Sequence, residues 1–253
     1  MSRISQLFSI RSEKVIPFLT AGYPNKLDTA KMVLAADEAG ASMVELGMPF
    51  SDPLADGPVI QQASQVAIQN GVNIEWILET VKEIRNSSEI PLVLMGYINP
   101  IIKYGLIKFM KGCRLAGVDG LIVPDLPPEE AEEFVQLARE NSISPILLVA
   151  PNTSSSRIKI ISGLSGDLIY CISILGITGS DNGMRNLEAY LTRVKENSSC
   201  PFVVGFGIKA REDIVLINKL AHGAVVGSAI INAMDGDTSP VETLKNYIER
   251  LVK

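Results

Sequence analysis

The most constraining feature of this sequence is a regular alternation of short apolar runs with amphipathic segments. The runs are continuous and rich in Val, Ile and Leu, which is typical of parallel strands covered on both faces. Between them apolar residues recur at helical spacing, as at positions 74, 77, 78, 81 and 84. The runs lie at residues 15–20, 43–46, 91–95, 120–123, 144–149, 168–172, 201–204 and 224–226.

Eight strand–helix units predict an α/β protein with a (β/α)8 (TIM) barrel, preceded by a short amphipathic N-terminal helix. We expect residues 1–253 to form one domain, because no linker or low-complexity stretch divides the chain. A doubly wound open sheet would carry a phosphate-binding signature after its first strand. The turn there is TAGYPN at 20–25, which is no G-x-G-x-x-G. A further helix is predicted over 129–140, after two prolines.

Composition narrows the function classes. The chain is 47% hydrophobic, enough for a sizeable core, and its net charge of −5 argues against a nucleic-acid partner. No stretch approaches the roughly 18 apolar residues of a membrane span, and residues 1–14 lack the features of a secretion signal. Three cysteines at no metal or redox spacing are expected in the core. We therefore expect a cytoplasmic protein.

Glu45 is the first candidate catalytic residue, because it is a carboxyl inside an otherwise apolar strand. Burial of an unpaired carboxylate costs several kcal/mol, so such a site raises the carboxyl pKa and suits a general acid or base. A Glu that only accepts structural hydrogen bonds from a neighbouring strand is the alternative.

The loop FSDPLADG at 50–57 follows Glu45 directly and can bring a second carboxylate over the barrel mouth. Asp52 and Asp56 each precede a Pro or Gly, so either is also an ordinary turn former. Two carboxylates in different environments can divide proton transfer from charge stabilisation.

Glycine turns end the last three strand runs, at 175–179, 205–208 and 226–229. In TIM barrels the loops after the seventh and eighth strands form a recurrent phosphate site, where glycines let backbone N–H groups approach the ligand. A phosphate ester is therefore the expected ligand. The aromatic residues Phe18, Tyr97 and Tyr170, at or near strand ends, belong to the core or line a flat apolar part of the substrate.

Other chemistries have little support in the sequence. The single histidine, His222, precedes the last strand run and so falls at the bottom of the barrel. Without His or Cys clusters we expect no metal site, and without a lysine inside a strand we expect no Schiff base.

The stretch ELGMPFSDPLADGP at 45–58 resembles the signature of the tryptophan synthase α-subunit family. Further matches follow in chain order and span nearly the whole sequence: PFLTAG at 17–22, LMGYINP at 94–100, VPDLP at 123–127, GITG at 176–179, GFGI at 205–208 and GSAI at 227–230. The 45–58 match is highly specific, whereas the glycine turns alone would fit many phosphate-binding barrels.

The resemblance implies a lyase of L-tryptophan biosynthesis that splits indole-3-glycerol phosphate into indole and glyceraldehyde 3-phosphate. It makes Glu45 the general acid and base, and Asp56 the acceptor for the indole N–H. Thr178, with Gly179 beside it, is expected to bond Asp56 when the site closes. The remaining implied substrate-binding residues are Gly207, Gly227 and Ser228 for the phosphate, and Phe18, Tyr97 and Tyr170 for the pocket wall.

The resemblance also implies a partner. We expect an α2β2 complex with a tryptophan synthase β subunit that carries pyridoxal phosphate, and no cofactor in this chain. Residues 49–56 and the segment around Asn99 resemble the contact surfaces. Lys209 departs from the family, which more often has a small hydroxyl residue there; it adds a charge to the phosphate site or points to solvent.

Two alternative functions remain open at this stage. One is a non-catalytic α-like protein that only binds and activates a β subunit, which loss of either carboxylate would have favoured. The other is a different phosphate-binding barrel enzyme, against which the contiguous 45–58 match argues.

Overall fold

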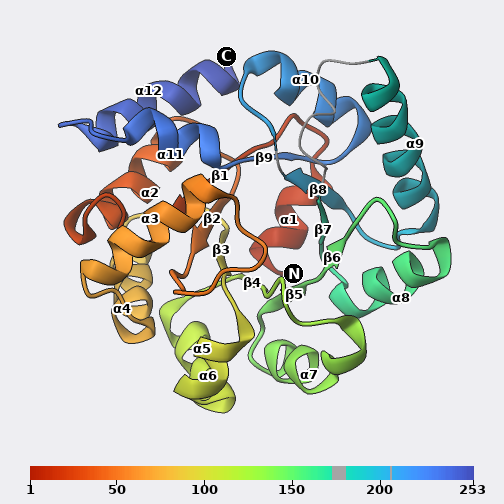
Figure 1. The fold of residues 1–253 in the computed structure, drawn as a ribbon. Coiled ribbons are helices and arrows are strands. Elements are labelled where there is room, and N and C mark those ends of the chain that lie inside the picture. The colour runs from red at the N-terminus through yellow and green to blue at the C-terminus, as the bar shows by residue number, and fades with distance from the viewer. Residues whose placement is uncertain (173–180, 206) are drawn as a thin grey trace.

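The computed structural model describes residues 1–172, 181–205 and 207–253, with the backbone alone for 181–184. Within these residues, the strands form one nine-stranded parallel sheet that curves into a barrel, with helices around it (Figure 1). The predicted (β/α)8 fold is confirmed. The strands are β1 Val15–Thr20, β2 Val44–Gly47, β3 Leu92–Met95, β4 Gly120–Ile122, β5 Ser144–Ile146, β6 Leu148–Val149, β7 Ile169–Ile172, β8 Phe202–Gly205 and β9 Ala224–Val226.

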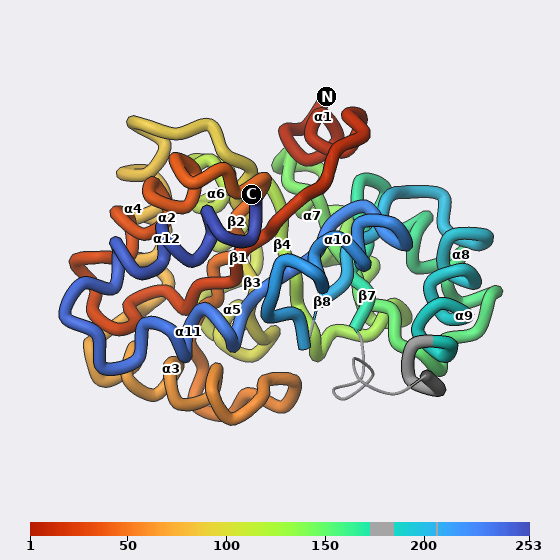
Figure 2. The backbone as a smooth tube through the Cα atoms, turned by 90° about the horizontal axis from the view of Figure 1, so that it is seen from above, coloured from red at the N-terminus to blue at the C-terminus, as the bar shows by residue number. Residues whose placement is uncertain are grey.

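The helices cover the outer face of the barrel, except α1, which lies across one end (Figures 1 and 2). They are α1 Arg3–Ser9, α2 Thr29–Glu38, α3 Pro58–Gln69, α4 Ile74–Arg85, α5 Ile98–Tyr104, α6 Leu106–Ala116, α7 Glu132–Glu140, α8 Ser155–Ser165, α9 Asp181–Asn197, α10 Arg211–Leu220, α11 Ser228–Met234 and α12 Pro240–Val252. Among the described residues, no helix has the length and hydropathy needed to cross a membrane.

The run predicted as one strand at 144–149 is divided into β5 and β6. Its first half pairs with β4 and its second half with β7, so the two halves face different neighbours. Leu147 lies between them, and its carbonyl accepts a hydrogen bond from Tyr170 N at 3.0 Å. The barrel is thus closed at this point by the continuity of a single segment.

The helix predicted over 129–140 begins later than expected. A 3-10 turn occupies Pro128–Glu130, and α7 starts only at Glu132. Pro127 and Pro128 lack an N–H, so the chain makes a tighter turn through Ala131 before the α-helical hydrogen bonds begin. Glu132 and Glu133 then occupy the first turn, where carboxylates interact favourably with the helix dipole.

Helix α1 closes the amino-terminal end of the barrel. Ser2 caps it by accepting a hydrogen bond from Ser5 N, and Ile4 is fully buried. A Cβ added at Gly120 on β4 would lie 2.9 Å from Ile4 Cδ1 and 3.0 Å from Ile146 Cδ1. The absent side chain at Gly120 therefore makes the space that Ile4 fills.

A buried carboxylate holds this end of the barrel together. Asp119, only 6% exposed, accepts hydrogen bonds from Arg3 Nη1 at 3.0 Å, Arg85 Nη2 at 2.6 Å and Leu92 N at 2.8 Å. One side chain therefore joins α1, α4 and β3. Its removal would leave the largely buried Arg85 guanidinium and a strand N–H without this partner.

We predict that Asp119→Ala lowers the free energy of unfolding by about 3–5 kcal/mol, the usual result of breaking a buried ion pair on one side. Urea unfolding at neutral pH measures it. Glu89→Ala is the matched control, because Glu89 also pairs with Arg3 but its side chain is 78% exposed, and we expect little change. A loss below 1 kcal/mol for Asp119→Ala would contradict the prediction.

Candidate active site

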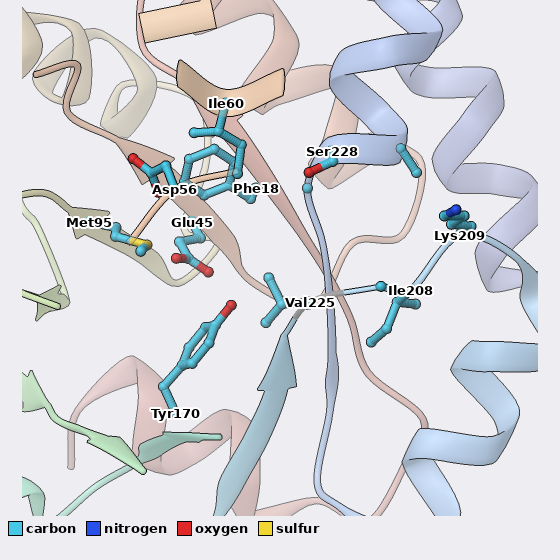
Figure 3. Close-up of a pocket in the computed structure, with 13 residues that line it drawn as sticks. Phe18, Glu45, Asp56, Ile60, Met95, Tyr170, Ile208, Lys209, Val225 and Ser228 are labelled. Atoms are coloured by element: carbon cyan, nitrogen blue, oxygen red, sulfur yellow. The ribbon is translucent and has the colours of Figure 1, made fainter. Parts of the chain in front are cut away.

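A pocket opens at the carboxyl ends of the strands (Figure 3). Helix α1 lies at the other end of the barrel (Figure 2). Its empty volume is about 600 Å³, including space open to solvent. Figure 3 shows both carboxyls at one side of the pocket and Ser228 at the other. The described lining residues are Phe18, Glu45, Asp56, Ile60, Met95, Tyr170, Gly207, Ile208, Lys209, Val225, Gly227, Ser228 and Ala229.

Glu45 faces this pocket from the middle of β2, between Phe18 of β1 and Val93 of β3 in the strand register. It is 1% exposed, and its Oε1 has no hydrogen-bond partner among the described residues. Burial, and secondarily the charge of Asp56, raises the pKa of Glu45 to about 8. A carboxyl in this environment keeps its proton at neutral pH and can give it to a ligand.

Asp56 reaches the same pocket from the loop before α3. Burial raises its pKa, and a hydrogen bond from the Tyr97 hydroxyl lowers it again. The two carboxyls thus differ in environment: Glu45 has an unpartnered oxygen in an apolar strand, whereas Asp56 has a donor. Such a difference favours a protonated Glu45 beside an ionised Asp56.

Tyr97 contacts the loop that carries Asp56 and is not among the described residues that border this pocket. Its hydroxyl donates to Asp56 and accepts from Ala55 N at 3.0 Å, and its ring lies 5.4 Å from that of Phe50. It also lines a neighbouring hollow with Pro49. Tyr97 therefore contacts the loop that carries Asp56, and its predicted place in the pocket wall stays a prediction.

Phe18 and Tyr170 do border the pocket, and glycines make room for both. A Cβ at Gly47 would lie 2.5 Å from Phe18 Cζ, and a Cβ at Gly205 would lie 1.7 Å from Tyr170 Oη. Figure 3 shows the Tyr170 hydroxyl pointing toward Glu45. Burial, then the nearby charge of Glu45, raises the pKa of Tyr170, so its hydroxyl stays protonated.

The glycine turns form the side of the pocket away from the carboxyls. Gly207 has a φ of +81°, a conformation that favours glycine, and Gly227 and Ser228 begin α11. Small residues at these places leave backbone N–H groups accessible to a ligand. The predicted residues Thr178 and Gly179 lie outside the described residues.

Some lining residues were not predicted from the sequence. Met95 and Val225 belong to predicted strand runs, so their register could have placed them facing inward. Ile60 on α3 carries no such signal, because its position depends on how the 50–57 loop folds back. His222 lies at the opposite end, where its Nδ1 accepts from Phe202 N at 3.3 Å, and all three cysteines are buried and free. In the described part of the chain, no three or more His, Cys, Asp or Glu residues group as metal ligands.

The raised pKa of Glu45 has a consequence for stability. In the unfolded chain this carboxyl ionises near its ordinary value of 4.5, whereas in the folded protein it stays protonated until about pH 8. Between these two pH values, Glu45 therefore lowers the free energy of unfolding by about 1.4 kcal/mol for each unit that the pH rises.

We therefore predict that Glu45→Gln, which cannot titrate, becomes more stable relative to wild type as the pH rises. Urea unfolding of both proteins at pH 5, 6.5 and 8 should show the difference growing by a few kcal/mol across the series. A difference that stays constant from pH 5 to 8 would rule out the raised pKa.

The sequence matches the family model described as tryptophan synthase alpha chain over residues 4–252. The tryptophan synthase alpha chain of Petrotoga mobilis is 43% identical over 254 residues, covering 100% of this chain and 98% of the relative. That of Prosthecochloris aestuarii is also 43% identical, covering 94% and 93%.

Solved structures agree with these relatives. The tryptophan synthase α subunit from Legionella pneumophila superposes with a TM-score of 0.92 at 32% identity, covering 99% of this chain and 97% of that one. A chain of the tryptophan synthase complex from Pyrococcus furiosus superposes with a TM-score of 0.88 at 38% identity, covering 95% and 98%. With a full-length family match, relatives above 40% identity and the same barrel, this chain belongs to the tryptophan synthase alpha chain family.

Proposed function

We propose that this protein is the lyase subunit that cleaves indole-3-glycerol phosphate to indole and glyceraldehyde 3-phosphate, in the last steps of L-tryptophan biosynthesis. The observation that carries the proposal is the buried Glu45 carboxyl, which faces the pocket with one unpartnered oxygen and holds its proton to about pH 8. Family membership supports the same activity.

In the first step, protonated Glu45 donates its proton to the indole ring carbon that bears the glycerol phosphate side chain. That carbon becomes tetrahedral, and positive charge develops at the ring nitrogen. The Asp56 carboxylate accepts a hydrogen bond from the ring N–H and offsets this charge. Tyr97, which donates to Asp56, helps to keep that carboxyl ionised and in place.

In the second step, Glu45 acts as a base. Its carboxylate takes the proton of the hydroxyl on the adjacent side-chain carbon, and that carbon becomes the aldehyde of glyceraldehyde 3-phosphate. The carbon–carbon bond breaks, and its electron pair returns to the ring, which leaves as neutral indole. Glu45 ends the cycle protonated, and no cofactor in this chain takes part.

The rest of the pocket suits the two ends of this substrate. We assign Phe18 and Tyr170 to the apolar indole end, because their rings line the pocket. We assign Gly207, Gly227 and Ser228 to the phosphate end, because they leave backbone N–H groups accessible and Ser228 lies away from both carboxyls (Figure 3). Tyr97, Thr178 and Gly179 stay predicted binding residues.

We predict that Glu45→Gln abolishes indole release, with a loss of at least about 1,000-fold, because an amide can neither donate nor accept the transferred proton. Asp56→Asn should lose about 100-fold, since a neutral amide cannot offset the ring charge. Indole released from indole-3-glycerol phosphate measures both, and circular dichroism checks folding. Near-normal turnover in the Gln variant would sink the assignment.

We further propose that the chain works in an α2β2 complex with a β subunit that holds pyridoxal phosphate. A solved relative from Pyrococcus furiosus is described as a tryptophan synthase a2b2 complex. Two large apolar side chains are exposed in or near the segments that the resemblance assigns to the contact surface: Leu54 within residues 49–56 is 90% exposed, and Ile102 on α5, close to Asn99 in the chain, is 60% exposed. Burial of such side chains against a partner would be favourable.

Leu54→Asp should weaken binding of the β subunit at least about tenfold, because a charge would be buried in an apolar contact. Titration of the β subunit by calorimetry measures the effect. Leu115→Asp, at a side chain 79% exposed on α6, is the control and should bind as wild type. Equal affinities for both variants would show that the loop lies outside the interface.

Two alternatives make different predictions. A non-catalytic partner would bind the β subunit but release no indole, alone or in the complex. Another phosphate-binding barrel enzyme would do neither. We also infer that residues 1–253 form one domain and that the protein is cytoplasmic, which its three free thiols support, since reducing compartments keep cysteines unpaired.

A further inference from the structure

Lys209 is the one Lys or Arg among the described residues that line the Glu45 pocket. It follows β8 and lies near Ile208, on the side of the pocket away from both carboxyls (Figure 3). Its side chain is exposed, and in the described part of the chain no carboxylate pairs with its Nζ. Other surface lysines, such as Lys245 and Lys108, do pair with carboxylates.

The backbone of Lys209 is held firmly at the pocket edge. Its N–H donates to Asp213 Oδ2 at 2.9 Å, and that same oxygen accepts from Ala210 N at 3.1 Å. Its carbonyl accepts from Tyr247 Oη at 2.6 Å, so α10 and α12 fix it from two directions. The position of the side chain at the pocket is therefore set by the fold, although the amine itself lies in solvent.

Charge at the two sides of the pocket is unequal. Glu45 and Asp56 occupy one side, and the lining carries no other carboxyl among the described residues. An incoming anion is repelled from the Asp56 side and attracted to the Lys209 side. Ser228 stands on this second side (Figure 3), and Gly207 and Gly227, which also line the pocket, are its neighbours in the chain or those of Lys209. A substrate with an apolar ring and a phosphate at opposite ends is thus oriented by charge as well as by shape.

We propose that Lys209 is a substrate-binding residue that pairs with the phosphate of the substrate and orients it with its ring toward Glu45 and Asp56. The inference rests on the proposed function. Lys209 touches the phosphate and takes no part in the proton transfers, so it acts on binding and not on the chemical step.

The test separates KM from kcat in wild type, Lys209→Met and Lys209→Arg. For Lys209→Met we expect the KM for indole-3-glycerol phosphate to rise about three- to tenfold, between the usual effects of an exposed ion pair and a charge-assisted hydrogen bond. We expect kcat to stay within about twofold, and the Arg variant to stay near wild type. Added salt should raise the KM of wild type more than that of Lys209→Met, because salt screens the pair.

The reverse reaction locates the effect on the substrate. When indole condenses with glyceraldehyde 3-phosphate, Lys209→Met should raise the KM for the phosphorylated aldehyde and leave the KM for indole unchanged. Lys219→Met is the matched control. Lys219 is exposed near the far end of α10, so this substitution removes the same charge at a place away from the pocket. It should behave as wild type in both directions.

An unchanged KM in Lys209→Met, or an equal rise in Lys219→Met, would overturn the inference while leaving the proposed function intact. Failure of the wild type to release indole would instead refute the proposed function. In that case inorganic phosphate still tests the lysine, because phosphate should raise the Tm of wild type and Lys209→Arg more than that of Lys209→Met. Equal shifts in all three would exclude phosphate binding by Lys209.

Discussion

The desolvation of a single carboxyl in β2 governs the chemistry of this protein. Glu45 is enclosed by neighbouring strands, and its Oε1 has no hydrogen-bond partner among the described residues, so the neutral carboxyl is favoured. The same burial that costs stability supplies a proton donor at neutral pH. The apolar barrel wall is therefore part of the active site. Additional hydrogen bonds to Glu45 would make the protein more stable but would weaken Glu45 as a proton donor.

The second carboxyl depends on a different kind of support. Asp56 belongs to a loop and not to a strand, and its position relies on the Tyr97 hydroxyl, which contacts both Asp56 and Ala55 N. The pocket thus combines one carboxyl on a strand, Glu45, with one carboxyl on a loop, Asp56. Lys209 follows a third pattern, with a backbone held by Asp213 and Tyr247 and a side chain exposed to solvent.

Much of this arrangement could be predicted from the sequence, because periodicity and strand-end polarity are local signals. The barrel, the strand runs and the pocket-facing positions of Glu45 and Asp56 follow from them. The division of residues 144–149 into β5 and β6 does not, since it depends on which neighbour each half pairs with. Nor could sequence predict that the Tyr97 hydroxyl accepts a hydrogen bond from Ala55 N, because that contact depends on how the 50–57 loop folds.

Ile4 extends the packed interior of the barrel to its amino-terminal end, where it is fully buried beside Gly120. Helix α1 and the Asp119 network close this end among the described residues, and the pocket opens at the carboxyl ends of the strands. Under the proposed function, the substrate enters and both products leave through this opening. A β subunit bound at Leu54 would contact the loop that carries Asp56, and would therefore lie where it can affect how indole and glyceraldehyde 3-phosphate leave the pocket.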